Sequence, residues 1–118
     1  NGNYHMDSGY LYFRSVDGRL LIGGGRNVDE KIEMTDVPGF NFKIRKHLED
    51  VVQKHILPNK NPNKNEFIIA EKWTGFIGVH DYKYDLIKRE NNVLRIGGYN
   101  GLGVTTGIQS GREIIEYI

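Results

Sequence analysis

The chain has 118 residues, a formal net charge of +1 and no cysteine. This length is that of one small domain with a modest core, and the lack of cysteine excludes disulfides, thiolate catalysis and cysteine metal sites. Balanced charge provides no basic face for nucleic acid, and no apolar run is long enough to span a bilayer. We therefore expect a single cytoplasmic domain over residues 1–118 that binds neither nucleic acid nor membrane.

The start of the chain has no clear pattern. Residues 1–9 lack periodicity, and a strand is predicted to open directly at Tyr10. This start is typical of a segment cut from a longer protein, and a natural short protein with a frayed N-terminus is the alternative.

A β-hairpin is the first predicted element. Residues 10–14 and 19–23 form two short runs rich in aromatic or aliphatic side chains. Asp17-Gly18 between them is a strong two-residue hairpin signal because both turn positions need positive φ. Neither a helix pattern nor a Lys-Ser/Thr pair follows Gly23-Gly24-Gly25. We interpret these glycines as a strand exit, a bulge or a close approach to a ligand.

A polar loop and a helix follow. Residues 27–39 are polar, and their acidic cluster indicates a solvated loop rather than a metal site. Residues 42–56 predict an amphipathic helix with Asn41 as N-cap and Pro58 just past its end. His47 and His55 have no partner at ligand spacing, so we expect surface or helix-end positions for them. The acidic cluster comprises Asp29, Glu30, Glu33 and Asp36, and the apolar stripe of the helix comprises Ile44, Leu48, Val51, Val52 and Ile56.

The next segments predict a connector and a strand. Residues 58–65 read P-N-K-N twice and predict an exposed loop. Residues 66–79 predict one long strand or a bent pair, in which Gly75 and Gly78 mark a bulge or a ligand approach. Residues 86–87 predict a short strand, and residues 88–92 a polar turn.

His80 and Asp81 are neighbours that could serve acid–base chemistry. Adjacent strand residues point to opposite faces, so we do not expect these two to act as a pair.

The C-terminal stretch combines a strand, a glycine-rich turn and a helix. Residues 93–96 are largely apolar, four glycines lie within residues 97–103, and a helical pattern follows. This arrangement brings backbone N–H groups close to an anion or an electron-rich ring at the positive end of a helix.

Gly103, Gly107 and Gly111 share one face of that helix. A glycine inside a helix costs about 1 kcal/mol relative to alanine, so a close contact must offset Gly107 and Gly111. The contact is either with the chain's own sheet or with a partner segment or cofactor.

Together these elements predict an α+β fold. A largely antiparallel sheet with one crossing helix spans about residues 10–90, and a C-terminal strand, glycine loop and helix spans about residues 93–118.

Three segments, in this order, resemble the C-terminal part of FAD-dependent oxidoreductases of the D-amino-acid oxidase/glycine oxidase type. The hairpin containing Asp17-Gly18-Arg19-Leu20-Leu21-Ile22-Gly23 resembles that family's D-G-R-L-L-I-G hairpin. Trp73-Thr74-Gly75-Phe76 resembles W-x-G-x. Residues 94–105, with Gly111-Arg112, resemble the family's final G-H-x-G-x-G-x-T loop and the G-R that follows it.

The resemblance implies FAD as the cofactor of a full-length parent, with the substrate-domain sheet formed by the hairpin and the Trp73 strand. We expect Arg14, Trp73 and His80 to contact the substrate, with Arg14 as a substitute anion holder, and no catalytic residue is identified, since the flavin carries the chemistry. The resemblance also implies that one loop lines the isoalloxazine ring, formed by Gly98, Tyr99, Asn100, Gly101, Leu102, Gly103, Val104 and Thr105.

Two departures from the family pattern shape the expected function. Ile77 falls where the family has a carboxylate-holding arginine, and residues 80–84 replace its T-x-D-G-x-P turn. The chain also lacks G-x-G-x-x-G. We therefore expect an N-terminal segment of the same protein to supply the ADP-binding half, and this fragment alone to be inactive and not to retain FAD.

The expected parent oxidises a small amine or amino-acid-like substrate by hydride transfer to flavin. The alternative is a non-catalytic ligand- or protein-binding module. Its recognition face would comprise Tyr10, Tyr12, Phe13, Trp73, Phe76, Tyr82 and Tyr84.

Overall fold

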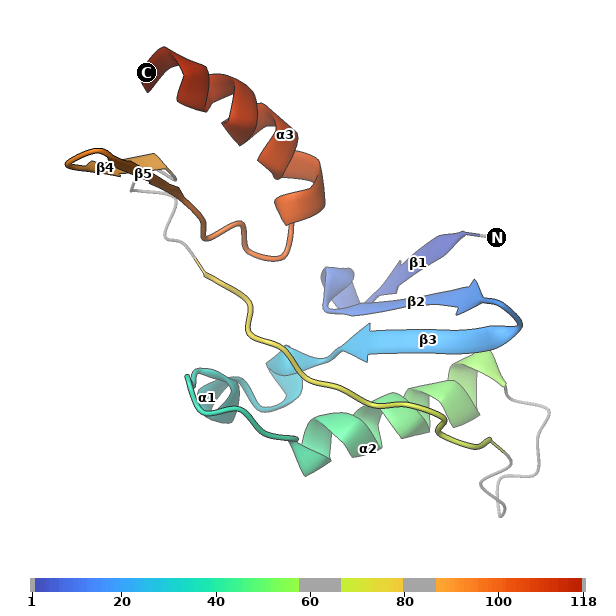
Figure 1. Cartoon of the computed structure of the whole chain (residues 1–118). Coiled ribbons are helices and arrows are strands. Elements are labelled where there is room, and N and C mark those ends of the chain that lie inside the picture. The colour runs from blue at the N-terminus through green and yellow to red at the C-terminus, as the bar shows by residue number, and fades with distance from the viewer. Residues whose placement is uncertain (1, 58–66, 80–86, 118) are drawn as a thin grey trace. The chain divides into compact units, whose positions relative to one another are not determined.

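The computed structural model describes residues 2–57, 67–79 and 87–117. The chain divides into a first unit, Asn1–Thr74, and a second unit, Gly75–Ile118. Each unit has its own antiparallel sheet and its own helix of ten residues or more (Figure 1). The predicted α+β class with antiparallel strands is therefore confirmed, and the single domain over residues 1–118 stays a prediction.

The sheet of the first unit has the order β1-β2-β3. β2 (Leu11–Val16) and β3 (Arg19–Gly24) form the predicted hairpin. Its two turn residues, Asp17 at φ 49° and Gly18 at φ 73°, both lie in the left-handed region, as the Asp-Gly signal requires.

The expectation that the chain has no strand before Tyr10 is wrong. β1 (Asn3–Met6) pairs antiparallel with β2. The rings of Tyr4 and Phe13, which are paired across these strands, stack with centroids 5.1 Å apart and planes 13° apart. Four residues are too few for a periodic signal, and β1 is stabilised by cross-strand contacts with β2 that a local pattern does not contain.

Each glycine of Gly23-Gly24-Gly25 makes a close approach inside the first unit. A Cβ on Gly23 would lie 2.7 Å from the Tyr12 hydroxyl oxygen, and one on Gly24 would lie 2.0 Å from the carbonyl oxygen of Tyr10. A Cβ on Gly25 would lie 3.3 Å from Ile44 of the helix α2. Of the three interpretations, the strand exit is therefore the one observed. The groups that these glycines approach are residues of the first unit and not a ligand.

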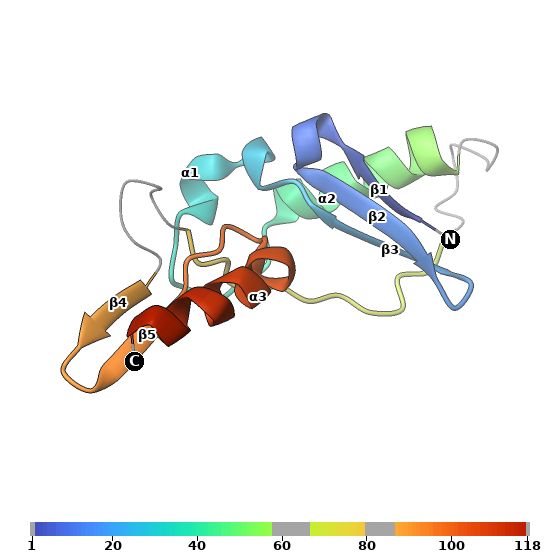
Figure 2. The same cartoon turned by 90° about the horizontal axis from the view of Figure 1, so that it is seen from above.

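The helix α2 (Phe42–Val51) continues into one π-helical turn, Val52–Ile56. The predicted helix over residues 42–56 is therefore confirmed, and its last five residues are π-helical and not α-helical. Asn41 is its N-cap, and its Oδ1 accepts hydrogen bonds from the backbone N–H groups of Lys43 and Ile44. α2 lies along the sheet beside β3 (Figure 2). The buried apolar residues of the first unit are Leu11, Val51 and Val52.

The expected surface position is wrong for His47. Its side chain is half-buried, and its Nε2 is buried without a hydrogen-bond partner in the described part of the chain. A Cβ on Gly25 would lie 3.6 Å from the His47 ring, so the ring packs where β3 ends. His55 is exposed, as predicted.

The polar stretch after β3 is more structured than the predicted loop. It contains a 3₁₀ turn, Arg26–Val28, and the short helix α1 (Glu30–Glu33). Asn41 Nδ2 donates to Asp29 at 3.1 Å and to Glu33 at 2.9 Å, and Lys43 Nζ lies 3.2 Å from Asp29 Oδ1. Two members of the acidic cluster therefore anchor the start of α2. Among the described residues no group of three or more His, Cys, Asp or Glu could hold a metal ion.

Asn41→Ala is expected to destabilise the first unit by about 1–2 kcal/mol, because it removes an N-cap.

Hydrogen bonds from Asn41 and Lys43, with the charge of Lys43, lower the pKa of Asp29, and burial opposes them. Ionised Asp29 therefore stabilises the fold above the ordinary aspartate pKa of about 3.9, and this contribution is lost as the pH falls through that value toward the folded pKa. Urea unfolding measures the first effect, and an NMR titration of Asp29 measures the second.

Asn41→Ser is the matched control for that experiment. Its hydroxyl oxygen can still cap the helix without adding charge, while the amide donors to Asp29 and Glu33 are lost, so most of the cap energy should survive while the pKa of Asp29 rises. Equal stability of the Ala and Ser variants at neutral pH would contradict the capping role.

The second unit contains the hairpin of β4 (Ile87–Glu90) and β5 (Val93–Ile96), then α3 (Gly103–Glu113) and a 3₁₀ turn, Ile114–Tyr117. The final strand and the glycine-loop helix are confirmed. The polar turn predicted over residues 88–92 is wrong for residues 88–90, which belong to β4. These charged residues fit a strand because it pairs with β5, and Glu90 contacts both Lys88 and Arg95.

The strand predicted over residues 66–79 is wrong for residues 67–79, which have no helical or strand structure. Their apolar side chains are exposed, with Ile68 at 95% and Trp73 at 68%. Strand propensity needs a hydrogen-bonding neighbour to be realised, and no described strand pairs with this segment. The connector at residues 58–65 and the strand residue Leu86 lie outside the described residues.

A bilayer-spanning helix would need about 20 apolar residues, and no helix in the described ranges is long and apolar enough.

Candidate functional site

The predicted flavin-facing residues form the turn from β5 into α3 in the second unit. β5 ends at Ile96, and α3 begins at Gly103. Three residues of this turn have a positive φ: Gly98 (77°), Asn100 (52°) and Gly101 (85°). We call residues 97–102 the glycine loop. Two of these left-handed positions hold glycine and one holds asparagine, because these residues tolerate a positive φ best.

The backbone amides of the glycine loop divide into two groups. The Asn100 N–H donates to the Gly78 carbonyl oxygen at 3.1 Å, and the Leu102 N–H donates to the Tyr99 oxygen at 2.8 Å. No acceptor within residues 67–79 and 87–117 accepts from the amides of Gly97, Gly98, Tyr99 and Gly101, or from those of Gly103 and Val104 in the first turn of α3. The last three of these, Gly101, Gly103 and Val104, lie at or next to the N-terminus of α3 and remain for a ligand.

The start of α3 lacks a side-chain cap. Leu102 is the N-cap residue, and no side-chain oxygen accepts from the first turn. Leu102 accepts the first helical bonds through its carbonyl, from the N–H groups of Thr105 and Thr106. The positive end of the helix dipole therefore coincides with the unpaired amides of Gly103 and Val104, an arrangement suited to an anion or an electron-rich atom.

The glycine loop is accessible in the second unit. Leu102 is 55% and Val104 is 95% exposed. A Cβ on Gly97 or Gly101 would meet no atom within 4 Å. A Cβ on Gly103 would lie 3.3 Å from the ring of Tyr99. The described side chains therefore leave room for a ligand to approach the backbone.

The helical glycines of α3 are open within the second unit. A Cβ on Gly107 or Gly111 would meet no described atom of that unit within 4 Å, so the β4–β5 hairpin does not supply the expected close contact, and packing against the sheet of the first unit or against a partner segment or cofactor both stay predictions. The buried residue of α3 is Ser110, whose hydroxyl donates to the Thr106 oxygen at 3.2 Å.

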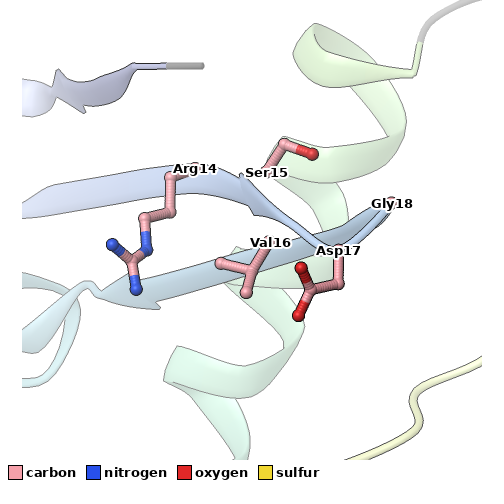
Figure 3. Close-up of a pocket in the computed structure, with 5 residues that line it drawn as sticks. All are labelled: Arg14, Ser15, Val16, Asp17 and Gly18. Atoms are coloured by element: carbon pink, nitrogen blue, oxygen red, sulfur yellow. The ribbon is translucent and has the colours of Figure 1, made fainter.

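The predicted substrate-side residues come from other segments of the chain than the glycine loop. Arg14 lies on β2 and lines a shallow, open depression at the hairpin end with residues 15–18 (Figure 3). Trp73 belongs to the first unit and the glycine loop to the second. His80, like the His80–Asp81 pair, lies outside the described residues. The substrate-binding roles of Arg14, Trp73 and His80 stay predictions.

The donor set of the glycine loop fits the edge of a flavin. Residues 97–105 carry no charged side chain, so nothing there repels negative charge. The available groups are uncharged backbone amides at a helix N-terminus. The pyrimidine edge of isoalloxazine presents acceptor atoms that become more negative when the ring is reduced, and amides of this kind stabilise that charge.

Along the sequence, an antiparallel sheet is followed by a strand, a glycine loop and a helix whose first backbone amides are unpaired among the described residues. Residues 2–117 match the family model described as FAD dependent oxidoreductase. The chain belongs to this family. No curated protein and no solved structure matched it in the corresponding comparisons.

One contact at the site was missed by sequence reasoning. Gly78 was interpreted as a bulge or a ligand approach, and the structure brings it against Gly98 and Asn100 of the glycine loop. About twenty residues separate the partners, and no local pattern encodes such a pairing. The isolated glycine was the available signal, since it indicated a close approach without identifying its partner.

Proposed function

We propose that this chain forms the substrate-side and flavin-contacting part of an oxidoreductase that oxidises a small amine or amino-acid-like substrate by hydride transfer to FAD. The observation that carries the proposal is the set of unpaired amides of Gly101, Gly103 and Val104 at the start of α3. Family membership supports FAD as the cofactor.

In this proposal the glycine loop holds the pyrimidine edge of the ring. The bound cofactor supplies a two-electron acceptor for the hydride that leaves the substrate carbon next to nitrogen. The chain's part is to orient the ring and to place N–H groups where negative charge develops. Because residues 97–105 are uncharged, this stabilisation comes from backbone dipoles and the end of α3.

We also propose that another segment of the same protein supplies the ADP-binding half. No described atom of the second unit lies within 4 Å of a Cβ placed on Gly107 or Gly111, which are one helical turn apart on α3. The helix cost of about 1 kcal/mol for each glycine is then offset by close packing of that segment's backbone. On this proposal the 118 residues alone bind FAD poorly and are inactive.

The residues next to the glycine loop favour an amine over an α-amino acid. Phe76, Ile77 and Val79 flank Gly78 and are 64%, 53% and 61% exposed. Residues 76–79 carry no charged side chain, so none of them offers a cation to a substrate carboxylate.

The test is an anaerobic titration of the full-length protein with pairs of an amine and the α-amino acid that differs from it only by the carboxylate. Bleaching of the oxidised flavin absorbance is expected with the amine at lower concentration than with the amino acid. Failure of every amine and amino acid to bleach the flavin would contradict the proposed reaction. Stoichiometric FAD in the purified 118-residue chain would contradict the proposed division of the cofactor site.

The exposure of aromatic side chains supports the alternative of a binding module. Trp73 is 68% and Tyr12 is 46% exposed. In that case Trp73→Ala would abolish binding of a ligand or protein without changing any flavin property, whereas the oxidoreductase proposal expects a change in substrate KM.

A further inference from the structure

We propose that Gly78 is a positioning residue, which holds the glycine loop in its ligand-binding shape through direct backbone contact. The inference rests on the proposed function, because the loop matters here as the part that contacts the flavin. It concerns a residue to which neither the family match nor the loop sequence assigns a role.

Two contacts within the second unit join Gly78 to the loop. Its carbonyl oxygen accepts a hydrogen bond from the Asn100 N–H at 3.1 Å. A Cβ placed on Gly78 would lie 3.6 Å from both the Cα and the backbone nitrogen of Gly98. The residue therefore bonds to the loop at Asn100 and approaches it closely at Gly98, which are two of the loop's three left-handed positions.

These positions are where the loop needs support. Asn100 is held at φ 52°, in the left-handed region that asparagine tolerates better than most residues but that still costs free energy relative to the right-handed region. Strained backbone persists where surrounding contacts over-determine it, and the bond to Gly78 is such a contact. Asn100 immediately precedes Gly101, whose free amide faces the proposed ligand, so a shift at Asn100 moves a donor.

The contact distance makes a graded test feasible. At 3.6 Å an added methyl group makes ordinary van der Waals contact, so Gly78→Ala should be tolerated. The branched side chain of Gly78→Val adds two carbons beyond that methyl and has restricted χ1 freedom, so it should push the segment away from Gly98. Gly75→Val is the matched control, because a Cβ on Gly75 meets nothing within 4 Å.

The experiment compares the three variants in the full-length protein by hydrogen exchange at the Asn100 amide, the flavin absorption spectrum and thermal unfolding. In Gly78→Val, Asn100 protection should fall about tenfold, the change expected for the loss of one hydrogen bond. The flavin bands should shift in the same variant. Gly78→Ala and Gly75→Val should retain both wild-type signals.

Each outcome decides the matter. Unchanged Asn100 protection in Gly78→Val overturns the proposal, and so does lost protection with an unchanged flavin spectrum. Equal effects of Gly75→Val also overturn it, because the segment would then act through general stability. Gly101→Val, which changes the loop itself, tells the two proposals apart: if it too leaves the flavin unchanged, the loop does not contact the flavin and the proposed function fails.

Discussion

Gly24→Ala is expected to destabilise the first unit by about 3–5 kcal/mol, among the largest losses that a single substitution causes. An added Cβ would lie 2.0 Å from the carbonyl oxygen of Tyr10, which is a clash with backbone rather than with a flexible side chain. That oxygen also accepts the Gly25 N–H at 2.8 Å, so moving it breaks a hydrogen bond between the start of β2 and the end of β3. Gly24 is further held at φ 97°, where alanine is strained.

Gly9→Ala separates the clash from the backbone strain. Gly9 has a similar φ of 89°, and a Cβ there meets nothing within 4 Å. Its substitution should cost only about 1–2 kcal/mol, the penalty of a left-handed residue with a Cβ. Urea unfolding of both variants measures the difference, and equal losses would mean that the Tyr10 contact contributes nothing.

Val104→Asp is expected to lower the flavin reduction potential by about 20–40 mV, if the glycine loop contacts the ring as proposed. Val104 is 95% exposed at the first turn of α3, so the substitution removes no packing. Two unit charges about 10 Å apart near a protein surface repel by about 1–2 kcal/mol, and about 1.4 kcal/mol corresponds to 30 mV for a two-electron couple. The carboxylate repels the negative charge of the reduced ring, which disfavours reduction.

The same substitution should have the opposite effect on the chain itself. Without flavin, an aspartate in the first helical turn stabilises α3 through the helix dipole, by about 0.3–1 kcal/mol. Val104→Asn, which is similar in size and uncharged, is the control and should leave the potential near wild type. A potential that rises or stays unchanged in Val104→Asp, measured by dye-coupled titration of the full-length protein, would argue against the loop as the flavin contact.

The agreement between sequence and structure is best where one short stretch contains the whole physical cause. Asp17-Gly18 supplies both left-handed turn residues of its hairpin. Asn41 caps α2 with an oxygen that reaches N–H groups two and three residues ahead. The glycine loop and the start of α3 follow in the same way from closely spaced glycines and an apolar periodicity.

The agreement fails where the cause is a contact between distant residues. β1 depends on pairing with β2, and residues 67–79 have strand-forming side chains but no described strand beside them. The half-buried position of His47 is set by its packing against the end of β3. A charge pattern alone could not reveal that Asp29 and Glu33 serve as anchors for Asn41.

The amino-acid sequence by itself determined the α+β class, the hairpin, the capped helix and the glycine loop before α3, because turn chemistry and helix capping act within a few residues. Only the tertiary structure decided that Gly24 faces a carbonyl oxygen, that Gly78 lies close to Gly98 and accepts from Asn100, and that the amides of Gly101, Gly103 and Val104 stay unpaired among the described residues. Such contacts depend on how segments far apart in the chain meet, and a donor can be identified as free only when the acceptors around it have been located.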